Sequence, residues 1–124
     1  MKVVIAGGRN FRDYAVLKEA ISRIQFQEMP VIISGGATGA DSLGERFAKE
    51  NGYPLLRFPA QWGVYGKAAG PIRNVRMAEE ADAVICFWDG YSPGTKHMIK
   101  ATKDRKKALI VFDYRGRVIQ TANV

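Results

Sequence analysis

Glycine is concentrated in three short segments of this chain, and each segment directly follows an apolar run. These runs are Lys2–Ala6, Val31–Ser34 and Ala83–Trp88. Glycine lets a backbone approach a ligand closely and adopt the positive φ angles that anion-binding turns need. A turn that leads into a helix also presents unpaired N–H groups and a partial positive charge. Such segments suit a phosphate or pyrophosphate, and the residues predicted to hold it are Gly7, Gly8, Gly35, Gly36, Thr38, Gly39, Gly90, Gly94 and Thr95.

Cationic and amide side chains accompany these segments. Arg9 lies in the first one, and Arg73 and Asn74 stand at the start of a later helical pattern. A cation at a helix start opposes the helix dipole, so Arg73 makes more sense beside a bound anion, which a guanidinium grips with paired donors. Arg76 can instead pair with a glutamate on its own helix. We therefore expect Arg9, Arg73 and Asn74 to belong to the anion site.

Three residues near the glycine segments could carry acid–base chemistry. Asp41 and Asp89 stand in the second and third segments, and His97, the only histidine, follows the third. Either aspartate can fix its own turn, or it can bind a ribose hydroxyl or hold Mg²⁺ beside a phosphate. A single histidine without further ligands argues against a resident metal, so no cofactor is expected to be required. Asp41, Asp89 and His97 are the candidate catalytic residues, with the alternative that His97 is a surface side chain.

These residues need a scaffold, and the apolar pattern predicts one. Runs rich in β-branched and aromatic residues, without alternation, indicate strands buried on both faces. Helical patterns lie between them, with start signals at Asp13, Ala40, Pro71 and Thr95. The predicted strands are Lys2–Ala6, Val31–Ser34, Leu55–Phe58, Ala83–Trp88 and Ala108–Phe112.

Strands that alternate with helices predict an α/β fold. We expect a single Rossmann-like three-layer domain over residues 1–124, with a five-stranded, mainly parallel sheet of order 3-2-1-4-5 and helices on both faces. In that order the glycine segments meet at the crevice between strands one and four. Residues 113–124 are expected to extend the domain, with a short edge strand at 117–121.

The connection from residue 59 to residue 70 is long for an α/β loop, and loops of that length are usually functional. It holds three glycines, two aromatic residues and a lysine. We interpret it as a lid, in which Trp62 or Tyr65 covers a base or ribose and Lys67 offers a cation. The alternative is an Ω-like loop that packs its aromatic residues against the sheet.

Charge is uneven along the chain, whose net charge is +7. Residues 1–89 hold 11 lysines and arginines against 10 acidic residues, and residues 90–124 hold 8 against 2. The basic C-terminal third is either a solvated helix face or a surface that attracts DNA, RNA or a phosphorylated small ligand. Aromatic residues are not interleaved among its lysines, which weakens the nucleic-acid interpretation.

Several classes of protein are excluded by what the sequence lacks. The single cysteine, Cys86, cannot form an internal disulfide and is expected in the core. No apolar run is long enough to span a membrane, so a cytoplasmic protein without membrane contact is expected. There is no G-x-G-x-x-G after the first strand, and Gly66-Lys67 is followed by Ala68 rather than Ser or Thr. An NAD dehydrogenase or a P-loop ATPase is therefore not indicated.

Several motifs together resemble a known group. The segment Ile33-Ser34-Gly35-Gly36-Ala37-Thr38-Gly39-Ala40-Asp41 resembles the glycine loop of the SMF/DprA–LOG (SLOG) superfamily. Ala69-Gly70-Pro71-Ile72-Arg73-Asn74, Ala81-Asp82-Ala83, Phe87-Trp88-Asp89-Gly90 and Gly94-Thr95 resemble the YspA, cpYpsA-related branch. The resemblance implies a Rossmann-like fold that senses or sequesters a nucleotide or nucleotide-derived ligand, such as an ADP-ribose-like molecule, in the cytoplasm.

Two groups of SLOG relatives imply alternatives. The LOG phosphoribohydrolases carry Arg-Lys-x-x-Met and Gly-Gly-x-Gly-Thr-x-x-Glu motifs. This chain has Arg73-Asn74-Val75-Arg76-Met77 and Gly94-Thr95-Lys96-His97-Met98, with Met98 where the catalytic glutamate stands. A hydrolase that cleaves an N-glycosidic or phosphoester bond would therefore need another acid. The DprA relatives imply single-stranded nucleic-acid binding, and related domains often self-associate, for which Val118 and Ile119 offer an edge.

Overall fold

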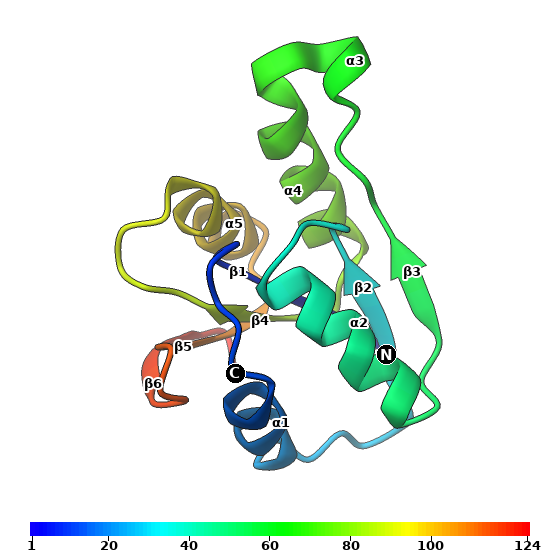
Figure 1. Cartoon of the computed structure of the whole chain (residues 1–124), viewed down its shortest axis with the longest axis vertical. Helices are drawn as coiled ribbons and strands as arrows, with labels where there is room; N and C mark the ends of the chain where they lie inside the picture. The colour runs from blue at the N-terminus through cyan, green and yellow to red at the C-terminus, as the bar shows by residue number, and fades with distance from the viewer.

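The computed structural model describes residues 1–124 as one twisted sheet with helices on both faces (Figure 1). The strand order is β3-β2-β1-β4-β5-β6, in which β1 to β5 run parallel and β6 runs antiparallel to β5. The predicted order 3-2-1-4-5 is therefore confirmed, with β6 as the edge strand expected near 117–121. The strands are β1 (Lys2–Gly7), β2 (Val31–Ser34), β3 (Leu55–Arg57), β4 (Ala83–Phe87), β5 (Ala108–Phe112) and β6 (Val118–Ala122).

The helices cover the two faces of the sheet in pairs. Helices α1 (Tyr14–Ser22) and α2 (Ala40–Glu50) pack on one face, and α4 (Ala69–Glu80) and α5 (Pro93–Asp104) pack on the other. Between β3 and α4, the short helix α3 (Trp62–Tyr65) and the 3₁₀ turn η1 (Gly66–Ala68) project beyond the N-terminal end of α4 (Figure 1). None of the helices has the length and apolar character needed to cross a membrane.

Alternate residues of the central strands fill two separate cores, which explains the continuous apolar runs. In β1, Val3 and Ile5 face α1 and α2, whereas Val4 and Ala6 face α4 and α5. Phe87 of β4 stacks on Phe11, with ring centroids 4.8 Å apart. Because each central strand is covered on both sides, both sets of alternate positions are mainly apolar.

The sequence signals differ from the structure in four places. Strand β3 lies at the edge of the sheet and is largely exposed, with Leu56 37 % accessible, so it is not buried on both faces. Helix α4 begins at Ala69, so Pro71 lies within its first turn rather than at its first position. Ser92, not Thr95, occupies the N-cap of α5. The predicted lid is partly helical instead of an irregular loop.

Other local predictions are confirmed. The Asp13 side chain accepts a hydrogen bond from the Val16 N–H at 3.2 Å and so caps α1. Cys86 is fully buried in β4, and burial raises the pKa of its thiol to about 12. Because β1, β2 and β4 run parallel, the loops that follow them lie at one edge of the sheet.

Candidate functional site

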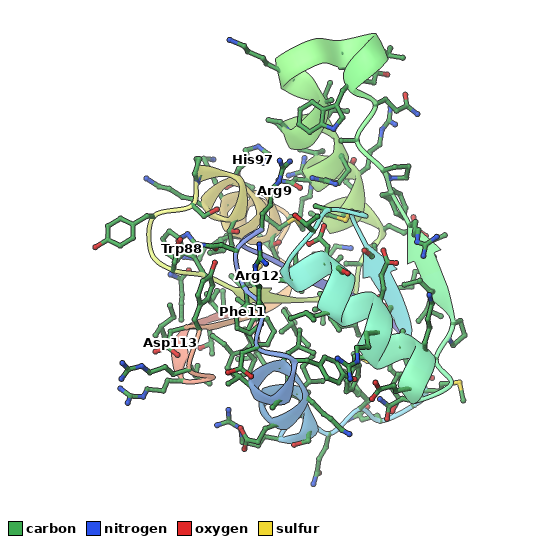
Figure 2. All side chains as sticks on the ribbon, in the orientation of Figure 1. Arg9, Phe11, Arg12, Trp88, His97 and Asp113 are labelled. Carbon is green, nitrogen blue, oxygen red and sulfur yellow. The ribbon has the colours of Figure 1, made fainter.

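A cavity of about 810 Å³ lies at this edge of the sheet, between the loops that follow the central strands and the starts of α4 and α5. Arg9 from the β1–α1 loop and His97 from α5 both line it (Figure 2). The sequence-predicted residues that line the cavity are Gly7, Arg9, Asp41, Trp62, Lys67, Arg73, Asn74, Asp89, Gly94, Thr95 and His97.

The other predicted residues do not line the cavity, and most have a structural role instead. A Cβ on Gly8 would overlap the Tyr114 hydroxyl, and one on Gly35 would overlap the Arg73 guanidinium. Gly36 and Gly90 adopt positive φ angles of 75° and 88° in open turns. The predicted residues off the cavity wall are Gly8, Gly35, Gly36, Thr38, Gly39, Gly90 and Tyr65.

The first two glycine loops are fastened to one another. The carbonyl of Gly8 accepts a hydrogen bond from the Ala40 N–H at 3.2 Å, at the start of α2. Gly39, with φ of 77°, sits so close to Gly8 that a side chain there would overlap backbone atoms. Glycine at position 39 therefore serves loop-to-loop contact, which the pattern of glycines alone does not distinguish from ligand contact.

Two N–H groups of the β2–α2 loop are occupied within the protein. The Gly36 N–H donates to Ser34 Oγ at 3.0 Å, and the Ala37 N–H donates to Asp41 Oδ2 at 3.3 Å. The loop is thus closed by its own side chains.

The start of α5 has free N–H groups on the cavity wall. The N–H groups of Gly94 and Thr95 have no partner in the protein, as expected for a first helical turn. Thr95 is only 4 % exposed and lines the cavity, and its hydroxyl has no hydrogen-bond partner in the protein. This helix start therefore offers unoccupied donors to the cavity.

Asp89 holds the turn that precedes α5. Its Oδ1 accepts hydrogen bonds from the N–H groups of Tyr91 and Ser92, each at 2.8 Å. These two bonds keep the pKa of the Asp89 carboxyl below its ordinary value. Trp88 adds a bond from Nε1 to the Ser92 carbonyl at 3.1 Å. Asp89 therefore lines the cavity, but its Oδ1 is already hydrogen-bonded within the turn.

Arg73 joins α4 to the second glycine loop. Its Nη1 donates to the Gly35 carbonyl at 2.6 Å, and its Nε donates to Asn74 Oδ1 at 3.0 Å. Burial lowers the pKa of this arginine, which the nearby Asp41 partly offsets. Part of its donor capacity is therefore used within the protein. Arg9, by contrast, is exposed on the cavity wall and makes no hydrogen bond or ion pair within the protein.

Asp41 is a buried carboxyl on the cavity wall, only 5 % exposed. Burial raises its pKa to about 6, although the hydrogen bond from Ala37 and the charges of Arg73 and Arg9 oppose this rise. Its Oδ2 accepts the Ala37 N–H, and its Oδ1 has no partner in the protein. Asp41 can therefore accept a hydrogen bond from a ligand.

Aromatic side chains stand at the rim. Trp62 of α3 is 51 % exposed, and Tyr91 of the β4–α5 loop is 88 % exposed, and both line the cavity. Tyr91 was not among the residues predicted from the sequence, although its position inside the third glycine segment was a usable signal. Tyr65 instead lines a separate hollow of about 150 Å³, where its hydroxyl accepts a hydrogen bond from Arg76 at 3.4 Å.

Metal-ligating side chains do not gather in this protein: no three histidine, cysteine, aspartate or glutamate residues come together anywhere in the chain.

Comparison with known proteins places the chain in a family. Residues 1–65 match the sequence profile of the YspA, cpYpsA-related SLOG family. A relative, the Gene 61 protein of Mycobacterium phage D29, is 33 % identical over 121 residues, which cover 90 % of this chain and 95 % of the phage protein. The chain belongs to the YspA, cpYpsA-related SLOG family. The profile match includes the first two glycine loops, whereas Arg73, Asn74 and the start of α5 lie beyond it.

The fold of this YspA-family chain is also seen in a solved structure. DNA processing protein A (DprA) from Streptococcus pneumoniae superposes with a TM-score of 0.73 over 90 % of this chain, at 19 % identity. The chain spans half the length of that DprA chain. The likeness therefore shows a shared fold, which agrees with the strand order described above.

Proposed function

We propose that this protein binds a nucleotide or nucleotide-derived ligand, such as an ADP-ribose-like molecule, in the cavity at the carboxyl edge of the sheet. The observation that carries the proposal is the free helix start of α5, where two unpaired N–H groups and the Thr95 hydroxyl line a cavity of about 810 Å³. A helix start of this kind attracts a phosphate group. The cavity is also of the size typical of small-molecule sites.

The phosphate is assigned to the start of α5 rather than to the β2–α2 loop. The Gly36 and Ala37 N–H groups are already bonded to Ser34 and Asp41, so they have little left to offer an anion. A phosphate beside an ionised Asp41 would also be repelled. Arg9 lines the same cavity, makes no ion pair within the protein and supplies a positive charge.

The cavity also offers groups that could bind the sugar and the base of a nucleotide. The free Oδ1 of Asp41 can accept a hydrogen bond from a sugar hydroxyl, which is a donor. Trp62 and Tyr91 offer flat rings at the rim, and a base or ribose can stack on such rings. These surfaces support a ligand that carries a phosphate, a sugar and a ring.

Calorimetry with AMP, ADP-ribose and NAD, compared between two arginine variants, tests this proposal. Arg9→Ala removes a free cation of the cavity and is expected to weaken binding about tenfold or more, the range for a hydrogen bond to a charged group. Arg12→Ala is the matched control, because Arg12 is exposed on the same loop but does not line the cavity. Absence of binding to all three compounds, or equal effects of the two variants, would contradict the proposal.

A hydrolase is the second candidate function, and one observation favours it. Asp41 is a buried carboxyl with a pKa of about 6, and an acid or base works best when its pKa lies near the working pH. Met98 lies on the cavity wall and cannot transfer a proton, so Asp41 would have to act in place of the LOG glutamate. Chromatography of AMP and ADP-ribose after long incubation separates the two functions, because pure binding leaves both compounds intact.

A further inference from the structure

The Asn74 side chain lies between α4 and α5 and contacts three groups at once. It is 7 % exposed. Its Oδ1 accepts a hydrogen bond from Arg73 Nε at 3.0 Å, and its Nδ2 donates to the Gly94 carbonyl at 3.2 Å. The same Nδ2 lies 3.3 Å from Nδ1 of His97. Asn74 therefore connects an arginine, the start of α5 and the only histidine.

The first two partners determine which way the Asn74 amide faces. A guanidinium N–H can only donate, and a backbone carbonyl can only accept. If the amide were rotated by half a turn, Arg73 would face an NH₂ group and the Gly94 carbonyl would face an oxygen. Both contacts would then be repulsive, so the amide nitrogen must face Gly94 and His97.

The fixed amide in turn determines the state of the histidine ring. The Asn74 NH₂ group has two hydrogens, of which one bonds the Gly94 carbonyl and the other is directed at His97. Nδ1 of His97 must then carry a lone pair, because a proton on it would meet the amide N–H. In a neutral imidazole the proton is then on Nε2.

We infer that Asn74 holds His97 in its neutral Nε2–H form, so that the cavity wall presents a hydrogen-bond donor to an acceptor oxygen of the ligand. His97 lines the cavity, and its Nε2 has no partner within the protein. The ligand part of this inference rests on the proposed function, since the acceptor we assign to this donor is a phosphate oxygen at the start of α5. Asn74 acts here as a positioning residue.

The donor has a consequence for ligand selection. A ligand that places an oxygen acceptor beside His97 gains a hydrogen bond, whereas one that places an amino group there meets two opposed donors. The N–H groups of Gly94 and Thr95 also favour an oxygen acceptor, because they too can only donate hydrogen bonds. The wall formed by α5 therefore selects for oxygen acceptors.

Nitrogen-15 NMR of the single histidine tests the fixed tautomer without any ligand. A ring with no fixed partner exchanges between tautomers and gives averaged nitrogen shifts, whereas the wild-type protein at pH 8 is expected to show a bare Nδ1 and a protonated Nε2. Asn74→Ala is expected to give averaged shifts. Asn74→Asp, which presents only acceptor oxygens, is expected to move the proton to Nδ1. Averaged shifts in the wild type would overturn the inference, even if a variant failed to fold.

Binding of AMP to His97 variants then tests the donor separately. His97→Gln keeps an N–H donor at the end of the side chain and is expected to bind AMP within about threefold of wild type. His97→Phe keeps the ring but removes the donor and is expected to bind about tenfold more weakly. Equal affinities for wild type and His97→Phe would overturn the donor role. If AMP, ADP-ribose and NAD all fail to bind wild type, the proposed function fails, while the NMR result still decides the tautomer.

Discussion

Gly39 lies directly against Gly8, and this contact joins the two glycine loops that precede α1 and α2. A Cβ on Gly39 would overlap the carbonyl oxygen of Gly8 and the backbone of Arg9, and the φ angle of Gly39 is 77°. The Ala40 N–H, next along the chain, donates to the same carbonyl at 3.2 Å. The position of Arg9 on the cavity wall therefore depends on a residue that has no side chain.

Gly39→Ala is expected to lower the free energy of unfolding by about 3 kcal/mol or more, because it combines backbone strain with overlap against main-chain atoms that cannot move away. Gly36→Ala is the matched control, since its φ is 75° but nothing lies within 4 Å of the added carbon. It is expected to cost about 1 kcal/mol, from strain alone. Urea unfolding measures both, and equal losses would contradict the contact described here.

Asp41→Asn is expected to stabilise the protein at neutral pH. The pKa of Asp41 is about 6 in the folded protein and 3.8 for the unburied carboxyl, so folding disfavours its ionised form. Stability is therefore lost as the pH rises from about 4 to 6, and roughly 3 kcal/mol is the upper limit of that loss. The variant should gain stability over wild type at pH 7.5 and lose that gain near pH 4, as measured by urea unfolding.

Asp89→Asn provides a control of opposite sign. Hydrogen bonds from Ser92 and Tyr91 lower the pKa of Asp89, so its ionised form favours the folded state. The stability that it contributes is present at neutral pH and is lost as the pH falls through its folded pKa. This variant should be less stable than wild type at pH 7.5, and the difference should shrink in acid. If the difference in stability from wild type changed with pH in the same direction for both variants, both pKa shifts would be contradicted.

Trp62→Ala is expected to weaken the binding of ADP-ribose about tenfold, because stacking of a base on an aromatic ring contributes about 1–3 kcal/mol. Val64→Ala, on the same short helix, should leave affinity unchanged, since Val64 is 71 % exposed and does not line the cavity. Titration calorimetry compares them. If α3 is only a packed loop without contact to a ligand, both variants will bind as wild type does.

Lys107→Met is expected to destabilise the protein by about 1 kcal/mol without changing any affinity for an oligonucleotide. Lys107 Nζ donates to the carbonyls of Glu79 and Ala81, at 3.1 Å and 2.6 Å, and so caps the end of α4. Lys106→Met removes an exposed lysine with no carboxylate partner and should leave thermal stability unchanged. Thermal melting, with fluorescence anisotropy of a labelled oligonucleotide, measures both properties. A stable Lys107→Met protein that loses oligonucleotide binding would instead favour a nucleic-acid surface.

The fold could be predicted from the sequence because its signals are local. Buried strands such as Ala108–Phe112 have no polar position, and Asp13 stands where a helix needs an acceptor for its free N–H groups. The helical part of the lid was not predictable in the same way. Trp62–Tyr65 and Gly66–Ala68 contain glycines and lack a capping side chain, so only their packing beside α4 determines their form.

The site was predicted by region but not residue by residue. Parallel strands bring the three glycine segments to one edge, which the topology alone implies. Which N–H groups remain free there depends on contacts between distant residues, such as Ala37 with Asp41 in one loop and Arg73 with Gly35 across two elements. Spacing in the sequence does not reveal such contacts.

The hydroxyl of Tyr114 donates to Asn10 Oδ1 at 2.6 Å, and its ring packs on Phe11 at 4.9 Å between centroids. These partners are 104 residues apart in the chain. Closing a loop of that length costs conformational entropy before the contact is gained. The turn that carries Arg9 therefore rests on a residue near the far end of the chain, so a change at Tyr114 is expected to alter the cavity wall although Tyr114 does not line it.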